Sequence, residues 1–215
     1  MSGEFGGRDG KRDRRTGAGA RQLICMAMLE TVGELGYAHT DIDDVIGRSG
    51  CSRNDYYRYF NNKEECFEAA YREEAERLVG AMLAPCASGS NWTEGLIAAL
   101  STALDFAAEY PRRAQALLNI GQVTEGAVAG VRQQVFERLS HALDRARRLP
   151  GSRHSAPPLT ATMMIGAVEN LVRGMLAGGE ASRAPTLLAD LTYLIVQSYF
   201  GDDEAFAAMD AARVG

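Results

Sequence analysis

The sequence contains few residues of the types that form metal, redox or catalytic sites. Only four of its 215 residues are cysteine, no two of them lie closer than fifteen positions, and none belongs to a Cys-x-x-Cys motif. Such spacing carries no zinc-binding or redox signature. The three histidines stand far apart, and the chain has no phosphate-binding loop, no nucleophile elbow and no dinucleotide-binding glycine motif. We therefore predict no cofactor, no metal site and no enzymatic activity.

Long hydrophobic runs and an excess of basic charge are also missing. No apolar stretch approaches the roughly 20 residues that a bilayer-spanning helix requires, and the glycine- and arginine-rich start has no apolar core of a secretory signal. This pattern predicts a cytoplasmic protein with no membrane partner. Because 23 basic side chains stand against 28 acidic ones, for a net charge of −5, any binding of nucleic acid has to rest on a local patch.

Residues 1–20 differ in composition from the rest of the chain. They include six glycines and five basic residues, with almost nothing to bury, so we expect a disordered basic arm. Two interpretations stay open. The arm is either a solvated tail, or a segment that lies along phosphates or reaches into a minor groove.

From residue 21 onward, apolar residues recur at steps of three and four, which predicts helices throughout and no strand. Capping-box spacing marks two helix starts, at Thr40 with Asp43 and at Ser52 with Asp55. We expect eight helices in chain order. The first ends at Gly36, the second lies between Thr40 and Gly50, the third starts at Ser52, and the fourth runs from Asn62 to Pro85. The remaining four span residues 92–110, 128–149, 159–177 and 184–200.

The last two expected helices, 159–177 and 184–200, are apolar on more than one side. A helix of this kind has to be covered on two faces. One face can meet the core of its own domain, and the simplest cover for the other is the same pair of helices in a second subunit. We therefore expect a homodimer formed through these helices.

Two short helices joined by a tight turn at Gly50 have the pattern of a helix-turn-helix. In that motif the first helix braces the second, whose first residues meet base edges in the major groove of DNA. Hydrogen-bond donors of the kind that bind phosphates surround the second helix here. They are Thr40, Ser52, Tyr57, Tyr59 and Lys63.

The stretch ICMAMLETVGELGYAHTDIDDVIGRSGCSRNDYYRYFNNKEE closely resembles the DNA-binding region of TetR-family transcriptional regulators. The resemblance covers residues 24–65 without a gap. The matching positions are Ile24, Ala27, Gly36, Tyr37, Thr40, Ile42, Val45, Gly50, Ser52, Tyr57, Tyr59, Phe60 and Lys63. The rest of the chain matches only in its helical architecture.

The resemblance implies an all-α fold, with an N-terminal three-helix DNA-binding domain and a larger C-terminal helical domain for ligand binding and dimerisation. The expected divisions are a basic arm at 1–20, the helix-turn-helix domain at 21–65 and the ligand-binding and dimerisation domain at 66–215. In such proteins Thr40, Ser52, Tyr57, Tyr59 and Lys63 contact the DNA backbone, while Arg53, Asn54 and Asp55 face the bases. Arg48 joins this contact surface through its charge.

Asp55 and the neighbouring tyrosines need separate treatment. Asp55 stands where the family usually carries a small neutral or hydroxyl residue, so it either caps the helix with Ser52 or accepts a hydrogen bond from a cytosine amino group. Helical spacing places Tyr56 inside the domain, which leaves Tyr57 and Tyr59 directed towards DNA.

The second domain contains aromatic, methionine and isolated polar residues that would suit a small-molecule pocket. Each apolar one can equally be plain core, because buried helices need such residues in any case. The resemblance favours the pocket. The candidate lining residues are Trp92, Phe106, Tyr110, Gln122, Met163 and Asn170.

These observations together predict a homodimeric regulator, a repressor that an unidentified small-molecule effector releases from a pseudo-palindromic operator in double-stranded DNA. It would reside in the cytoplasm, on the nucleoid when bound to DNA. The helix that starts near Asn62 would carry the signal between domains. Two alternatives stay open: a ligand-binding or interaction module with degenerate DNA binding, and a redox-sensing regulator that uses the thiol of Cys86 or Cys66.

Overall fold

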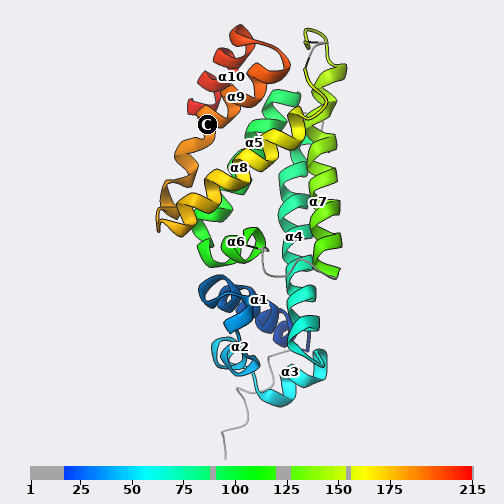
Figure 1. Cartoon of the computed structure of the whole chain (residues 1–215), viewed down its shortest axis with the longest axis vertical. Coiled ribbons are helices and arrows are strands. Elements are labelled where there is room, and N and C mark those ends of the chain that lie inside the picture. Colours follow the sequence, from blue (N-terminus) through cyan, green and yellow to red (C-terminus); the bar gives the residue numbers. More distant parts are fainter. Residues whose placement is uncertain (1–16, 88–90, 120–126, 154–155, 215) are drawn as a thin grey trace, which may run out of the picture.

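The computed structural model describes residues 17–87, 91–119, 127–153 and 156–214, and within these ranges it contains helices and no strand. The all-α prediction is therefore confirmed. The molecule is elongated, with α1 to α3 gathered at one end and the remaining helices forming a larger body (Figure 1). We refer to residues 17–62 as the head and to α4 with the helices that follow it as the body.

The head consists of α1 (Gly17–Leu35), the 3-10 turn η1 (Tyr37–His39), α2 (Ile42–Ser49) and α3 (Arg53–Tyr59). Two glycines with positive φ, Gly36 at 80° and Gly50 at 64°, separate these elements. Only glycine adopts this left-handed conformation without strain, so each one ends a helix at the residue where the sequence pattern placed the end. Gly50 stands in the turn between α2 and α3.

The predicted capping box of α3 is present. The Asp55 amide donates to the Ser52 hydroxyl at 3.1 Å, and the Ser52 amide donates to the Asp55 carboxylate at 3.1 Å. The prediction for α2 was wrong by one residue, because Asp41 is its N-cap and the Asp41 amide donates to Asp44 at 2.9 Å. The Thr40 hydroxyl instead donates to the carbonyl of Gly36 at 2.9 Å, closing the turn before the helix.

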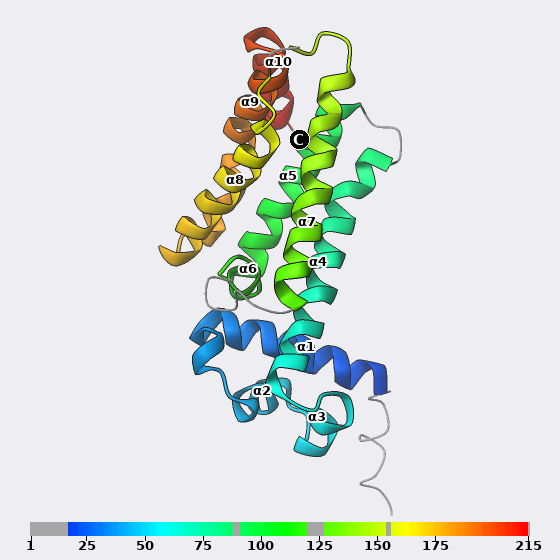
Figure 2. The same ribbon diagram turned by 45° about the vertical axis from the view of Figure 1, so that its right-hand side comes forward.

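Helix α4 (Lys63–Ala87) starts directly after the head and runs without interruption through the body. There it lies beside α5 (Trp92–Glu109) and α7 (Ala127–Asp144), as the turned view shows (Figure 2). The second long contact between head and body is α1 against α6 (Pro111–Leu118). The sequence predicted the break at Tyr110-Pro111 but not α6, for which the proline supplies the first residue.

The body is completed by the 3-10 turn η3 (Arg145–Arg148), α8 (Thr160–Ala177), the 3-10 segment η4 (Ala181–Leu187), α9 (Leu188–Tyr199) and α10 (Asp202–Val214). The expected helix at 184–200 thus starts four residues later, after η4. Helix α10 was not predicted, and it packs along α9.

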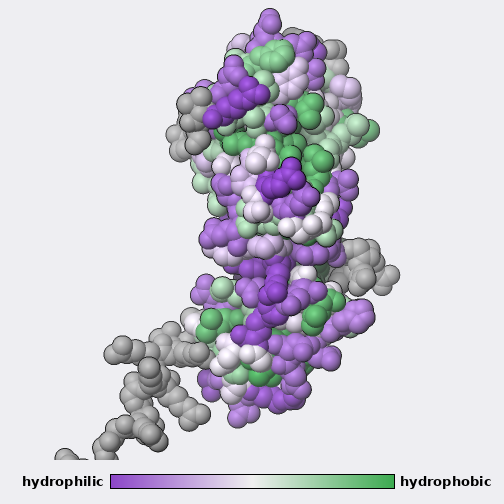
Figure 3. Space-filling view, turned by 90° about the vertical axis from the view of Figure 1, so that its left-hand side faces the viewer, coloured by the Kyte–Doolittle hydropathy of each residue, from purple (hydrophilic) through white to green (hydrophobic). Residues whose placement is uncertain are grey.

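Several large apolar side chains of α8, α9 and α10, and that of the residue before α8, remain exposed to solvent. They are Leu159, Met163, Leu171, Leu194 and Phe206. Hydrophobic residues lie among hydrophilic ones on the face formed by these helices (Figure 3). In a single subunit, the apolar face of α8 and α9 is therefore unburied. This is the face that the sequence analysis assigned to a second subunit.

Candidate nucleic-acid interface and ligand cavity

The helix-turn-helix formed by α2 and α3 lies at the end of the molecule furthest from the body (Figure 2). Tyr56 is fully buried, with its ring 5.8 Å from that of Phe60 and its hydroxyl donating to the carbonyl of Asn62 at 3.1 Å. This anchor confirms the predicted inward position of Tyr56. Tyr57 is 47% exposed, whereas Tyr59 is half-buried against the core of the head.

The first turn of α3 presents polar side chains to solvent. Ser52, Arg53 and Asn54 are exposed, and Asp55 is half-buried by its capping bonds. A short helix with exposed polar residues at its start, held from behind by a second helix, is the geometry that reads base edges in a major groove. The structure therefore brings Ser52, Arg53, Asn54 and Tyr57 together on one exposed surface.

Two residues expected to contact phosphates, Thr40 and Lys63, instead make hydrogen bonds inside the protein. Thr40 is fully buried, with its hydroxyl bonded inside the turn. The ammonium of Lys63 donates to the carbonyls of Tyr37 at 3.0 Å and Thr40 at 2.9 Å, and sits 4.5 Å from the centre of the Tyr37 ring. In this conformation both residues hold the η1 turn against the start of α4, so they position the head.

Every arginine in the described part of the head is paired with a carboxylate. Arg48 on α2 contacts Glu34 and, at 3.5 Å, Glu30, both on α1. The other pairs are Arg53 with Asp43, Arg58 with Asp55, and Arg21 with Glu73 of α4. Residues 17–65 carry five basic and eight acidic side chains. The exposed surface of α3 is therefore polar without an excess of positive charge.

Head and body meet closely at α1 and α6. A Cβ atom added to Gly33 would lie 1.8 Å from the carbonyl oxygen of Arg112, so only glycine permits this approach. The Arg112 guanidinium lies 3.2 Å from Glu34, and Glu34 also pairs with Arg48. One carboxylate thus connects α6 of the body to α2 of the helix-turn-helix.

A buried ion pair joins α6 to α4 beside this contact. Glu74 and Arg113 are each about 8% exposed and lie within hydrogen-bonding distance. Arg113 is flanked by the rings of Phe106 and Tyr110, at 5.5 and 4.4 Å from their centres. Arg77 also donates to Glu74 at 2.7 Å from the exposed side. This cluster locks the two helices that link the body to the head.

The body contains a partly open cavity of about 210 Å³ between α4, α5, α6, α7, α8 and α9. Its walls are almost wholly apolar, with leucine, valine, alanine, methionine and aromatic side chains. A dry apolar cavity of about 150 Å³ can hold a ligand the size of benzene. The cavity therefore has the size and surface of a site for a small apolar molecule.

Three polar side chains interrupt the apolar wall. Arg132 of α7 donates to Glu169 of α8 at 2.9 Å, and Tyr71 of α4 donates to the carbonyl of Leu117 at 3.4 Å. Burial raises the pKa of Tyr71 to about 12, while Arg132 lowers it and Glu169 raises it. All three side chains line the cavity.

The predicted pocket residues separate into three groups. Trp92 and Phe106 line the cavity. Tyr110 does not line it and is 37% exposed beside Arg113, while Met163 is 65% exposed and Asn170 is also exposed. Gln122 lies outside the described residues. The helical pattern gave α8 two apolar faces but did not say which one turns inward.

Sequence reasoning missed Arg132. Glu169 was one of the isolated polar residues considered for a pocket, but it was not assigned to the lining, and its pairing with Arg132, 37 positions away, was not predicted. The sequence offered one indication, a charged residue on the inner face of each of the amphipathic helices α7 and α8. That indication can be used only when the structure shows which face is the inner one.

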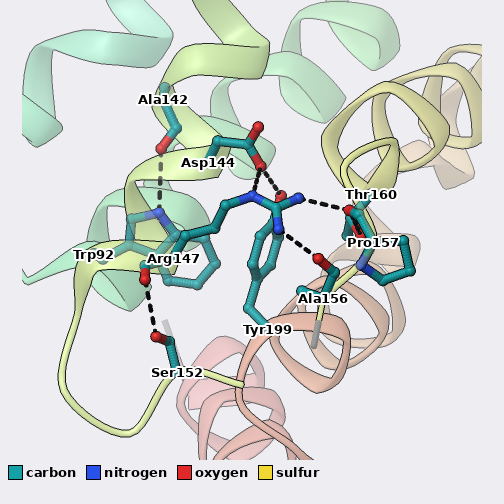
Figure 4. A network of polar contacts seen from close by, with 9 residues as sticks. All are labelled: Trp92, Ala142, Asp144, Arg147, Ser152, Ala156, Pro157, Thr160 and Tyr199. Carbon is teal, nitrogen blue, oxygen red and sulfur yellow. Dashed lines mark hydrogen bonds and ion pairs between the residues drawn. The ribbon is translucent and has the colours of Figure 1, made fainter. Parts of the chain in front are cut away.

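The end of the body opposite the head is fixed by a polar network around Arg147 (Figure 4). The Arg147 guanidinium donates to Asp144 at 2.8 Å and to the carbonyls of Ala156 and Pro157 at 2.6 and 2.7 Å. The Tyr199 hydroxyl donates to the same Asp144 at 2.9 Å. The network binds the segment after α7 to α9.

Trp92 lies beside this network and forms part of the cavity wall. Its indole N–H donates to the carbonyl of Ala142 at 3.2 Å (Figure 4), and its ring contacts Tyr199 and Phe200 at 5.7 and 5.5 Å between centres. Trp92 is also the only tryptophan of the sequence. Its fluorescence therefore reports on a single position, in the wall of the cavity.

Two buried thiols are poorly suited to redox sensing. Cys66 is fully buried and Cys25 is 5% exposed, and burial raises the pKa of each thiol from 9.0 to about 12. The reactive species is the thiolate, which neither forms near neutral pH. The side chain of Cys86 lies outside the described residues.

We expect the Cys86→Ser variant to release no colour with a disulfide reagent for thiols at pH 8 while it is folded, because its remaining cysteines, Cys25, Cys51 and Cys66, are buried. Three thiols should react once guanidinium is added. Rapid labelling of one thiol in the folded variant would show that a buried cysteine is accessible after all.

Among the described residues, no cluster of histidine, cysteine and carboxylate side chains is arranged to hold a metal ion. No helix in those ranges is long and apolar enough to cross a bilayer.

No family model matches this sequence, and neither does a curated protein. Solved structures do match over most of the chain. The regulator FadR of Bacillus subtilis superposes with a TM-score of 0.71 at 16% identity, over 82% of this chain and 97% of FadR. A TetR-like transcriptional regulator of Rhodococcus sp. RHA1 gives 0.64 at 26% identity, over 82% and 94%. The chain has the fold of the TetR-family regulators.

A third structure of this family supports the same conclusion for the TetR-like chain. SmeT, the repressor of a multidrug efflux pump of Stenotrophomonas maltophilia, superposes with a TM-score of 0.63 at 21% identity, over 83% of this chain and 89% of SmeT. The similarity extends through the body as well as the head. It confirms the resemblance inferred from residues 24–65 and extends it to the helical domain.

Proposed function

We propose that this TetR-like protein is a transcriptional regulator that binds a specific DNA sequence as a homodimer. The observation that carries the proposal is the exposed start of α3, where Ser52, Arg53, Asn54 and Tyr57 lie together at the tip of the head. Arg53 and Asn54 are the side chains that we assign to bases, since arginine suits guanine and asparagine suits adenine. We place the protein in the cytoplasm, on the nucleoid when bound to DNA.

The proposed partner subunit is a second copy that covers α8 and α9. Their exposed apolar side chains support this assignment, because a monomer gains nothing by leaving them in water. A two-fold dimer presents two α3 helices, which reach successive major grooves when their centres are about 34–36 Å apart. The operator should accordingly be pseudo-palindromic.

The proposed regulation is repression that a small molecule relieves. The cavity supports this role, since part of its wall comes from α4 and α6, the two helices that also contact the head. A FadR has been solved with stearoyl-CoA and SmeT with triclosan. A ligand that binds one arrangement of α4 and α6 better than another shifts the population of DNA-binding dimers.

Selection of random DNA duplexes by the purified protein tests the function directly. We expect enrichment of a two-fold symmetric site, with half-sites about one helical turn apart. Asn54→Ala should relax preference at one position of each half-site while leaving phosphate contacts in place. Binding without enrichment of any sequence would overturn the proposal and assign the function to the body.

Dimer formation gives a second prediction. Met163→Glu introduces a charge into the exposed apolar set, so we expect the protein to elute as a monomer in size-exclusion chromatography with light scattering. Since Met163 is 65% exposed, the subunit itself should keep its helix content. Gln133→Glu adds the same charge to an exposed position of α7 and should stay dimeric. A dimeric Met163→Glu variant would argue against this face.

The basic arm gives a third prediction. Because the arginines of the head are already paired, we expect removal of residues 1–16 to weaken DNA binding and to reduce the salt slope by about 0.9 for each phosphate that the arm neutralises in the full-length protein. Replacing the five basic residues of this segment by glutamine in the full chain should have the same effect. An unchanged affinity and slope would show that the arm does not touch DNA.

A further inference from the structure

The polar groups of the cavity restrict the charge of the molecule that it can bind. This inference rests on the proposed ligand site and concerns its chemistry. Arg132 and Glu169 face the cavity as a closed ion pair at 2.9 Å, with side chains 37% and 25% exposed. The pair brings one positive and one negative charge, so this part of the wall is neutral.

A charged ligand would leave this part of the wall with an unbalanced charge. A carboxylate that bonds to Arg132 competes with Glu169 for the guanidinium and places two negative charges against one positive charge. An ammonium that bonds to Glu169 places two positive charges against one negative charge. Solvent reaches the pair, so the cost is smaller than for a fully buried pair, but the ligand still gives up part of its own hydration without a balancing charge.

An uncharged ligand avoids this cost. Arg132 uses one of its five N–H groups on Glu169, and the other carboxylate oxygen of Glu169 makes no hydrogen bond to a described residue. The Tyr71 hydroxyl can also accept a hydrogen bond, since it donates only to Leu117. A hydroxyl or carbonyl group can therefore bond to these groups while the ion pair stays closed.

Arg173 is the nearest other charge on α8. It lies one helical turn beyond Glu169, donates to the carbonyl of Leu118 at 3.2 Å, and lines a neighbouring pocket together with Arg132 but not this cavity. It thus provides a control position that is charged but lies outside the site.

We propose that the cavity selects an uncharged effector with an apolar body and one hydroxyl or carbonyl group, and that the Arg132–Glu169 pair excludes carboxylates and amines of the same size. The pair acts as a filter for charge, and the apolar walls supply the affinity.

Three eight-carbon probes that differ only in their end group test this selectivity. Octan-1-ol, octanoate and octylammonium are titrated into the full-length protein at neutral pH, followed by Trp92 fluorescence and by calorimetry. We expect octan-1-ol to bind at least about tenfold more tightly than either ion, a difference of about 1.4 kcal/mol. Octanoate binding as tightly as octan-1-ol would overturn the proposal.

Variants of the pair sharpen the test. Glu169→Gln leaves Arg132 unpaired and should turn the preference towards octanoate, while Arg132→Gln should turn it towards octylammonium. The double variant, with both charges removed, should again prefer the alcohol. Arg173→Gln should keep the wild-type order. Thermal unfolding followed by circular dichroism confirms that each variant is folded, and an order of preference that Glu169→Gln does not change would contradict the inference.

The outcome is separable from the test of function. Operator selection uses no ligand, so the absence of binding by all three probes would overturn the charge filter and leave DNA recognition as measured. If operator selection failed while octan-1-ol was clearly preferred, the proposed DNA recognition would be overturned and the charge filter would stand.

Discussion

Glu74→Leu is expected to lower the free energy of unfolding by about 3–5 kcal/mol, the usual cost of leaving one charge of a buried ion pair without its partner. The guanidinium of Arg113 would remain about 8% exposed between Phe106 and Tyr110, with no carboxylate to balance it. Its Nε atom already lacks a hydrogen-bond partner among the described residues. Urea unfolding followed by circular dichroism measures the change in stability.

The two ends of this pair should not be equivalent. Arg113→Met leaves Glu74 with its second partner, Arg77, so we expect a smaller decrease in stability than for Glu74→Leu. The double variant places two apolar side chains side by side and should recover most of the stability. Arg77→Met, which removes the exposed partner, should cost about 1 kcal/mol or less. Additive effects in the double variant would show that the pair is not coupled.

Gly33→Ala is expected to destabilise the protein by about 1–3 kcal/mol, the range for overpacking a tight contact. The added methyl group would meet a backbone carbonyl of α6 at 1.8 Å, and a backbone atom cannot turn aside as a side chain can. Helix α1 would have to move away from α6, which strains the Glu34 contacts with Arg112 and Arg48 as well. Urea unfolding measures the stability change.

Gly80→Ala serves as the matched control for this substitution. Gly80 lies exposed within α4, and an added Cβ would have no neighbour within 4 Å. Replacing glycine by alanine inside a helix then stabilises by about 0.5–1 kcal/mol. Opposite signs for the two variants are the expected result. A Gly33→Ala variant as stable as the wild type would show that α1 and α6 separate freely.

The head could be predicted from sequence because short-range rules determine it. Gly36 and Gly50 end helices through their own backbone conformation, and Ser52 with Asp55 caps α3 across three residues. The same rules failed by one residue at α2, where Thr40 and Asp41 compete for the cap. Thr40 does not cap the helix because the Gly36 carbonyl, four residues earlier, accepts its hydroxyl.

The contacts that these side chains make within the protein could not be predicted in this way. Lys63 bonds to carbonyls 26 and 23 residues away, and Arg48 pairs across 14 residues. Pattern reasoning sees a cation near a helix start and assigns it to phosphate. It cannot see a closer acceptor supplied by a distant segment. The cavity pair of Arg132 and Glu169 escaped detection for the same reason.

Helix α10 was missed although a signal was present. Gly201 precedes three acidic residues, Asp202 to Glu204, which favour the positive end of a helix dipole. The following residues are rich in alanine and give a weak apolar stripe. Helix α6 gave an even weaker signal in the sequence, because its eight residues are too few to show a helical repeat of apolar positions.

The paired arginines of the head affect how such a protein searches a genome. Phosphate contacts normally gain their strength from the release of condensed counterions. An arginine that already holds a carboxylate has to exchange one anion for another, so random DNA offers the head little gain. Short encounters and frequent hopping between segments follow, in place of long sliding. Under the proposed function, only a site whose bases form hydrogen bonds with α3 would offset this exchange and retain the protein.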